Sequence, residues 1–188
     1  MSDLVAAPTV ISVDPGGTTG WSIMACHEEA MVDRDVPILM NIEHEERGQI
    51  PCIGIEGGEE ACAEYIVGMA LAWPGACLCI ESFYIRQMSV DLSPVRITAM
   101  IKYGLYKAAH EGPTNLVVVE QQPAMAKTVA TNDHLKKWGF WNKTEGMDHA
   151  RDADRHSITL LRRALLDAPL RGELWPHIYK ANGELRAD

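Results

Sequence analysis

Two short apolar segments, each ending in an acidic residue, constrain the fold of this chain more than any other feature. Residues 9–14 (TVISVD) end in Asp14, and residues 76–81 (ACLCIE) end in Glu81. Short apolar runs bounded by turn residues are typical of buried strands, and the ligand sites of open α/β sheets lie beyond the carboxyl ends of the strands. A charge there is costly unless it is paired or binds metal, so Asp14 and Glu81 are the first candidates for a functional site.

Turn signals and apolar periodicity predict an α/β chain in which these two strands belong to one mixed sheet. The turn at residues 15–17 predicts a hairpin between the first strand and residues 20–26, and a third strand is expected at 36–43, followed by a polar loop at 45–49. The remaining expected elements are strands at 76–81 and 115–120 and helices at 58–73, 93–110, 131–138 and 149–166. We expect a five-stranded mixed sheet flanked by helices, in one domain spanning residues 1–188, with 167–188 as a C-terminal tail.

Length and composition favour a single soluble domain. The 188 residues suit one hydrophobic core, and no apolar run approaches the roughly 18 residues that span a bilayer. The first residues lack the pattern of a signal peptide, and five cysteines without a C-x-x-C motif favour reduced thiols over a zinc site. These features predict a cytoplasmic protein with no membrane contact.

The net charge of −9 is unusual for a protein that binds nucleic acid, but the charge is unevenly distributed. Residues 27–64 hold 11 acidic and 2 basic side chains, whereas residues 121–163 hold 8 basic and 5 acidic ones. This contrast is compatible with two differently solvated faces, or with a phosphate-binding face in the later half. Charge alone leaves both interpretations open.

The helix expected at 149–166 begins with acidic and histidine side chains that lie on different faces. At about 100° per residue, His149, Asp152 and His156 fall within roughly 60° of one another, whereas Asp154 lies roughly 140° from His149. The spacing favours His149 and Asp152 as metal ligands, with Asp154 as a rival. The alternative is that the two aspartates only complement the helix dipole. His156 either orients a ligand or is a surface histidine.

Carboxylates from two strand ends and one helix are typical of a divalent-metal site. Mg²⁺ suits carboxylate oxygens, and a pair of ions about 3.5–4 Å apart can activate water and stabilise the leaving oxygen in phosphodiester hydrolysis. Asp14, Glu81 and Asp152 would form such a cluster. Glu120, which ends the strand at 115–120, is a further candidate.

Three motifs resemble those of RuvC-type Holliday junction resolvases, which belong to the RNase H-like superfamily. The segment VDPGGTTGWSIM resembles their first-strand motif, LCIESFY resembles their second motif, and HARDADRHSI resembles their C-terminal helix motif. The order and intervals match across about residues 9 to 166. The set is more similar to phage-encoded members, particularly mycobacteriophage ones, than to the bacterial chromosomal enzyme.

The resemblance implies an RNase H-like fold, a homodimer, and cleavage of Holliday junctions or related forks or flaps with two Mg²⁺ or Mn²⁺ ions. By position it implies these metal ligands and catalytic residues: Asp14, Glu81, His149 and Asp152. A histidine at 149 occurs in some members and favours Mn²⁺, whereas Asp154 stands where an apolar residue is common. The side chains expected to contact DNA are Phe83, Tyr84, Arg86, Lys127, Lys136, Lys137 and Arg151.

Two other classes of protein remain as alternatives. Residues 14–20 (DPGGTTG) also resemble the phosphate loop of actin-like, sugar-kinase-type phosphotransferases. That architecture needs two such domains, and no second phosphate loop follows. A non-catalytic junction-binding protein would share the fold but lack ligands, and none is plainly missing here.

Overall fold

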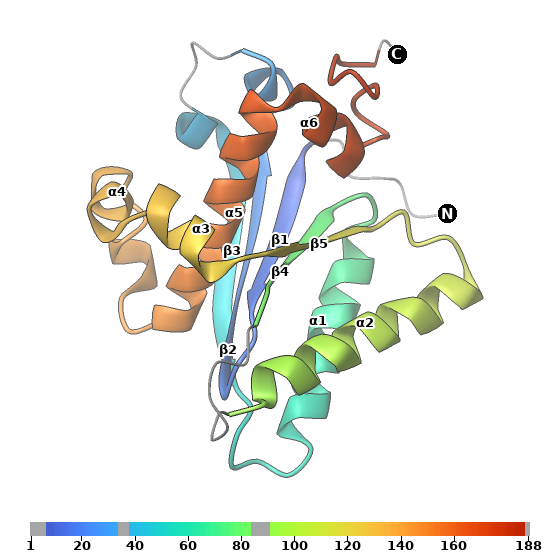
Figure 1. Ribbon diagram of the computed structural model, residues 1–188. Helices are drawn as coiled ribbons and strands as arrows, with labels where there is room; N and C mark the ends of the chain where they lie inside the picture. The colour runs from blue at the N-terminus through green and yellow to red at the C-terminus, as the bar shows by residue number, and fades with distance from the viewer. Residues whose placement is uncertain (1–6, 34–37, 84–90, 187–188) are drawn as a thin grey trace.

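The computed structural model describes residues 7–33, 38–83 and 91–186, which form one mixed β-sheet with helices on both faces (Figure 1). The strand order is β3-β2-β1-β4-β5. Strand β1 pairs antiparallel with β2 and parallel with β4, while β3 extends the sheet beyond β2 and β5 extends it beyond β4. The strands are β1 (Thr9–Asp14), β2 (Thr18–Cys26), β3 (Ile42–Pro51), β4 (Cys77–Glu81) and β5 (Val117–Gln121). The expected five-stranded mixed sheet flanked by helices is confirmed.

The helices form two layers that bury two separate hydrophobic cores. Helices α1 (Gly58–Ala72) and α2 (Ser93–Glu111) cover one face of the sheet. The long helix α5 (Asp148–Leu166) lies on the other face (Figure 1). Around α5 lie α3 (Pro123–Val129), α4 (Asn132–Lys137), α6 (Ala168–Leu174) and the short 3-10 helices η1 (Glu29–Met31), η2 (Ile38–Asn41) and η3 (Asn142–Thr144).

Side-chain alternation along the strands sends both strand-end acids to the α5 face. In β4, Cys77 and Cys79 pack in the core beneath α5, whereas Leu78 and Ile80 pack beneath α1 and α2. Glu81 follows the alternation of the two cysteines, because successive side chains point to opposite faces. The same alternation in β1 places Asp14 on the α5 face. Val13 is paired with Ile80, so the two acids follow adjacent positions.

The third strand was predicted wrongly. Residues 38–41 form η2, and the strand is β3, so the predicted loop at 45–49 is strand instead. β3 is an edge strand that pairs only with β2. Its polar segment (EHEERGQ) lacks the apolar alternation by which strands are recognised, because cross-strand hydrogen bonds rather than two-sided burial hold it. Its position brings Arg47 against α5.

The tail at 167–188 adds α6 and a buried aromatic pair to the core beneath α5. Trp175 and Tyr179 are fully buried, and Trp175 Nε1 donates to the carbonyl oxygen of Thr9 at 3.0 Å. Arg171 donates to the carbonyl oxygen of Ala164 at 2.8 Å, which anchors α6 to the end of α5. The tail thus packs against the first strand and the last long helix.

The cysteines and the helices of the described part of the chain bear on two further expectations from the sequence. All five cysteines are buried, and none of them forms a disulfide in the described part of the chain. Within residues 7–33, 38–83 and 91–186, none of the helices combines the length and apolar character needed to cross a membrane.

Candidate functional site

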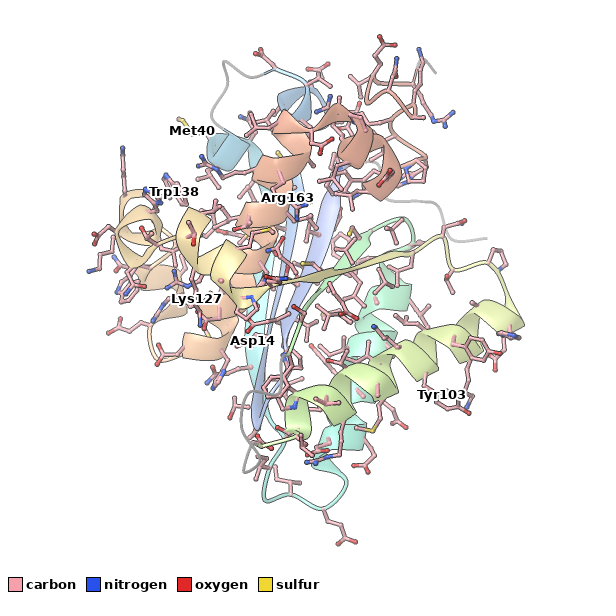
Figure 2. The ribbon with its side chains drawn as sticks, viewed as in Figure 1. Asp14, Met40, Tyr103, Lys127, Trp138 and Arg163 are labelled. Atoms are coloured by element: carbon pink, nitrogen blue, oxygen red, sulfur yellow. The ribbon has the colours of Figure 1, made fainter. Side chains whose placement is uncertain are left out.

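Asp14 lies where β1 meets the first turn of α5 (Figure 2). Its Oδ2 atom is 3.3 Å from Nδ1 of His149. The pKa of Asp14 is raised, chiefly because burial disfavours its charged form, although the hydrogen bond with His149 opposes this shift. The negative charges of Glu81 and Asp152 raise it further. The structure therefore brings three of the predicted carboxylates within range of one another's charge.

Gly20 allows α5 to approach the sheet this closely. It is the residue of β2 that pairs with Asp14. A β-carbon at Gly20 would lie 2.0 Å from the carbonyl oxygen of His149 and 2.6 Å from the backbone nitrogen of Ala150. Only glycine leaves room for the backbone of the helix at this point. The glycine thereby sets the approach of His149 to Asp14.

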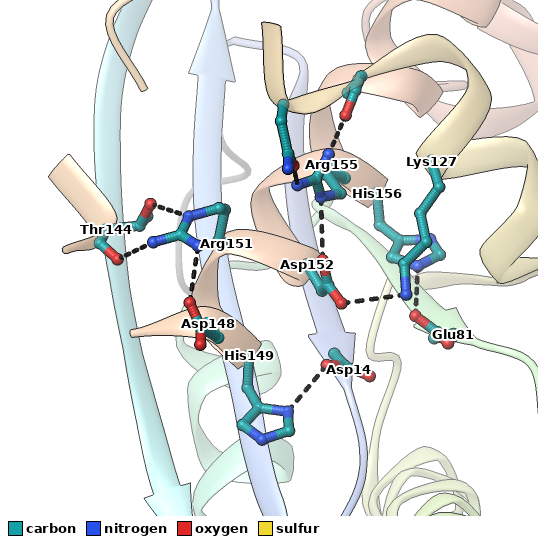
Figure 3. A network of polar contacts seen from close by, with 12 residues as sticks. Asp14, Glu81, Lys127, Thr144, Asp148, His149, Arg151, Asp152, Arg155 and His156 are labelled. Atoms are coloured by element: carbon teal, nitrogen blue, oxygen red, sulfur yellow. Dashed lines mark hydrogen bonds and ion pairs between the residues drawn. The ribbon is translucent and has the colours of Figure 1, made fainter. Parts of the chain in front are cut away.

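Glu81 is held by a histidine one helical turn beyond Asp152. Nε2 of His156 lies 2.7 Å from Oε2 of Glu81 (Figure 3). The imidazole is 1% exposed, so His156 is not a surface histidine. Its Nδ1 atom lies 3.0 Å from Nε2 of Gln121, which pairs with Glu81 across β4 and β5. The sequence prediction ended the last strand at Glu120 and therefore missed Gln121.

Two basic side chains contact Asp152, one from α5 and one from α3 (Figure 3). Nε of Arg155 donates to Oδ1 at 2.9 Å, and Nζ of Lys127 lies 3.2 Å from Oδ2. Arg155 is itself nearly buried and donates to the carbonyl oxygen of Ala130 and to the side chain of Asn132. An open pocket beside Asp152 is lined by Lys127, Thr131, Asn132, Asp133, Asp152 and Arg155.

Asp154, the predicted rival ligand, is directed away from this cluster. It is fully buried, and its Oδ2 atom accepts from Nε of Arg47 on β3 at 3.0 Å. Burial raises its pKa to about 6, although the charge of Arg47 opposes the shift. Glu120 is also directed elsewhere, because its carboxylate pairs with Lys102 of α2 on the opposite face of the sheet. Neither acid is gathered with Asp14, Glu81 and Asp152.

The residues predicted to contact DNA differ in how far their side chains are exposed and in their contacts within the protein. Lys127, Lys136 and Lys137 are exposed, and Figure 2 shows Lys127 close to Asp14. The guanidinium of Arg151 instead lies 4.0 Å above the ring of Trp141 and also binds Thr144 and Asp148. Phe83 is half-buried. The remaining two predicted contacts, Tyr84 and Arg86, lie outside the described residues.

The chemistry of this cluster fits a divalent cation, although the carboxylates are now bound to basic side chains. Within the described part of the chain, no three His, Cys, Asp or Glu side chains are gathered closely enough to bind one ion as they stand. The donors are nevertheless carboxylates, which suit both Mg²⁺ and Mn²⁺, and an imidazole, which suits a transition metal. Burial and the negative charges of Glu81 and Asp152 disfavour the charged form of Asp14, and the hydrogen bond with His149 offsets them only in part, so its pKa is raised. A cation among these carboxylates would relieve that cost.

The sequence matches no protein-family model and no curated protein. Several solved structures are similar in fold, and two of them are RuvC structures. A T. thermophilus RuvC in complex with a Holliday junction substrate matches with a TM-score of 0.56 and 13% identity, covering 85% of this chain and 96% of RuvC. A second Thermus thermophilus RuvC structure matches with a TM-score of 0.57 and 14% identity, covering 84% and 96%.

The sheet order and these similarities define the class of protein by its architecture, which is the RNase H-like fold. More particularly, it is the form of that fold seen in RuvC. Identities of 13% and 14% carry the fold and nothing finer. Both neighbours are Thermus thermophilus proteins, so the expected likeness to phage-encoded members stays a prediction.

Proposed function

We propose that this chain is a metal-dependent, structure-selective endonuclease that hydrolyses phosphodiester bonds in Holliday junctions or related branched DNA. The observation that carries the proposal is the convergence of Asp14, Glu81 and Asp152 where β1, β4 and α5 meet. A similarly folded RuvC has been solved with a Holliday junction substrate. Fold alone does not define function, so the proposal depends on these side chains.

Asp14, Glu81, Asp152 and His149 would hold the metal ions. When bound, Mg²⁺ or Mn²⁺ ions activate water and stabilise the leaving oxygen of a phosphodiester. The imidazole of His149 favours Mn²⁺, because nitrogen ligands suit transition metals better than Mg²⁺. Burial of Asp14 to 14% side-chain exposure limits competing water around its carboxylate.

Exposed lysines beside the carboxylates support DNA as the substrate. Lys127 reaches Asp152 from α3, and its side chain is 56% exposed, so it can bind a phosphate of DNA docked at the site. Lys136 and Lys137 extend this basic surface along α4. The contact of Arg151 with Trp141 assigns it instead to holding η3 against α5.

A homodimer is part of the proposal, since a four-way junction presents two strands for symmetric cleavage. The outer face of α2 has exposed aromatic side chains available for an interface, with Tyr103 and Tyr106 64% and 61% exposed. Sedimentation equilibrium of the full chain tests this part. A monomer at all concentrations would refute it.

The direct test is cleavage of a labelled panel comprising a four-way junction, a fork, a flap and plain duplex, with Mg²⁺ or Mn²⁺. Asp14→Asn and Glu81→Gln should each lower cleavage by more than about a hundredfold while leaving DNA binding intact, because loss of even an outer-shell partner costs about 10–100-fold. Glu120→Gln is the matched control, since this acid of β5 pairs with Lys102 away from the cluster.

Four results would contradict the proposal. Unchanged cleavage by Asp14→Asn would refute the proposed site, and equal cutting of plain duplex would refute the proposed structure selectivity. Junction binding without cleavage by the unmodified protein would favour a non-catalytic binding protein. Tight metal-dependent binding of ATP in calorimetry would favour the actin-like phosphotransferase.

A further inference from the structure

A buried chain of hydrogen bonds runs from β5 through α5 to the end of β4. It joins Gln121, His156 and Glu81, and the first two side chains are 2% and 1% exposed. Glu81 is the outermost member, at the edge of the candidate site (Figure 3). These hydrogen bonds therefore link a proposed metal ligand to groups that solvent and substrate do not reach.

The hydrogen-bond geometry favours a proton on Nε2 of His156, because the carboxylate of Glu81 beside it accepts. Nε2 of Gln121 lies 3.0 Å from Nδ1 of His156 and 3.4 Å from the backbone carbonyl oxygen of His156. A carbonyl oxygen only accepts, so the amide nitrogen of Gln121 must face it. That NH2 group also donates to Nδ1, which is then unprotonated, and the ring proton is on Nε2.

The opposite orientation of the Gln121 amide is less favourable. It would place Oε1 against the carbonyl oxygen of His156, where two acceptors repel. In the observed orientation, Oε1 is buried and has no hydrogen-bond partner among the described residues. An unsatisfied acceptor is costly, and the two hydrogen bonds that the amide donates to His156 offset this cost.

We propose that Gln121 and His156 are positioning residues that fix the orientation of the Glu81 carboxylate, an inference that rests on the proposed metal-dependent function. Nε2–H of His156 donates to Oε2 of Glu81 at 2.7 Å. This bond holds one oxygen of a side chain that would otherwise rotate freely at the end of a strand. Such outer partners commonly orient metal ligands.

Two substitutions of His156 separate positioning from mere core filling. His156→Leu keeps a similar volume but removes the donor, whereas His156→Gln retains an NH2 group that can reach Glu81. We expect Mn²⁺ binding, measured by calorimetry without DNA, to weaken about 10–100-fold in His156→Leu and to stay within a few-fold of the unmodified protein in His156→Gln. The matched control is Thr159→Val on the same helix, since Thr159 is buried and its hydroxyl has no partner among the described residues.

A second measurement detects the hydrogen bonds of His156 without a metal ion and without an activity assay. Long-range ¹H–¹⁵N spectra of the histidine rings should show His156 protonated at Nε2 alone. In Gln121→Leu, we expect a mixture of the two tautomers of His156, with the proton on Nδ1 or on Nε2. Its Mn²⁺ affinity should lie between those of the unmodified protein and His156→Leu. This variant carries the test if thermal unfolding shows that His156→Leu does not fold.

The outcomes distinguish this inference from the proposed function. Three outcomes would overturn the positioning role of His156 and leave the nuclease proposal intact. They are unchanged Mn²⁺ binding by His156→Leu, equal losses in His156→Leu and His156→Gln, and a ring proton on Nδ1. An unmodified protein that neither binds Mn²⁺ nor cleaves DNA would overturn both.

Discussion

Replacing Gly20 with alanine should disturb the candidate site by pushing the first turn of α5 away from the sheet. The added β-carbon would lie 2.0 Å from the carbonyl oxygen of His149, whereas ordinary contact begins near 3.4 Å, so the first turn of α5 must move by about 1.4 Å. The obstructing atoms belong to the backbone, which cannot rotate aside as a side chain can. Overpacking of this kind costs about 1–3 kcal/mol of stability.

The displacement should reduce activity as well as stability. A misplacement of about 1 Å costs on the order of a hundredfold in rate, and the moving turn carries His149 away from Asp14. We expect Gly20→Ala to lower junction cleavage about a hundredfold and to weaken Mn²⁺ binding in calorimetry. Urea unfolding should report a loss of stability of about 1–3 kcal/mol.

Gly68→Ala is the matched control for this substitution. Gly68 lies within α1, and a β-carbon there would meet no atom within 4 Å. Alanine inside a helix is favoured by about 0.5–1 kcal/mol over glycine, so this variant should be slightly more stable and fully active. Wild-type stability and Mn²⁺ affinity in Gly20→Ala would refute the close approach of α5 to β2.

Two further predictions concern charged side chains. Burial raises the pKa of Asp154 from 3.8 to about 6, so its contribution to stability is fully present below about pH 4 and is lost as the pH rises through about 6. Urea titrations should therefore show a smaller decline between about pH 4 and 7 for Asp154→Asn; an unchanged decline would contradict the raised pKa. Lys127→Gln should lower the slope of log affinity for DNA against log salt by about 0.9, whereas Lys180→Gln, at the distant tail, should leave it unchanged.

Buried strands were predictable because their own residues carry the signal. β1 was predicted with its exact bounds, and β4 was predicted to within one residue, since both are apolar on both faces. The acids at their ends were therefore identified before the fold was known. β3 was missed because an edge strand is held by the hydrogen bonds of its neighbour and needs no apolar pattern of its own.

The sequence by itself determined the buried strands and the long helices, the two strand-end acids and the polar stripe of His149, Asp152 and His156, because each depends on local periodicity. The tertiary structure decided which acids meet. One residue along a strand reverses the face, so Gln121 joins Glu81 while Glu120 pairs across the sheet with α2. It also decided the partners of each carboxylate and the close packing at Gly20, because these contacts join residues far apart in the chain.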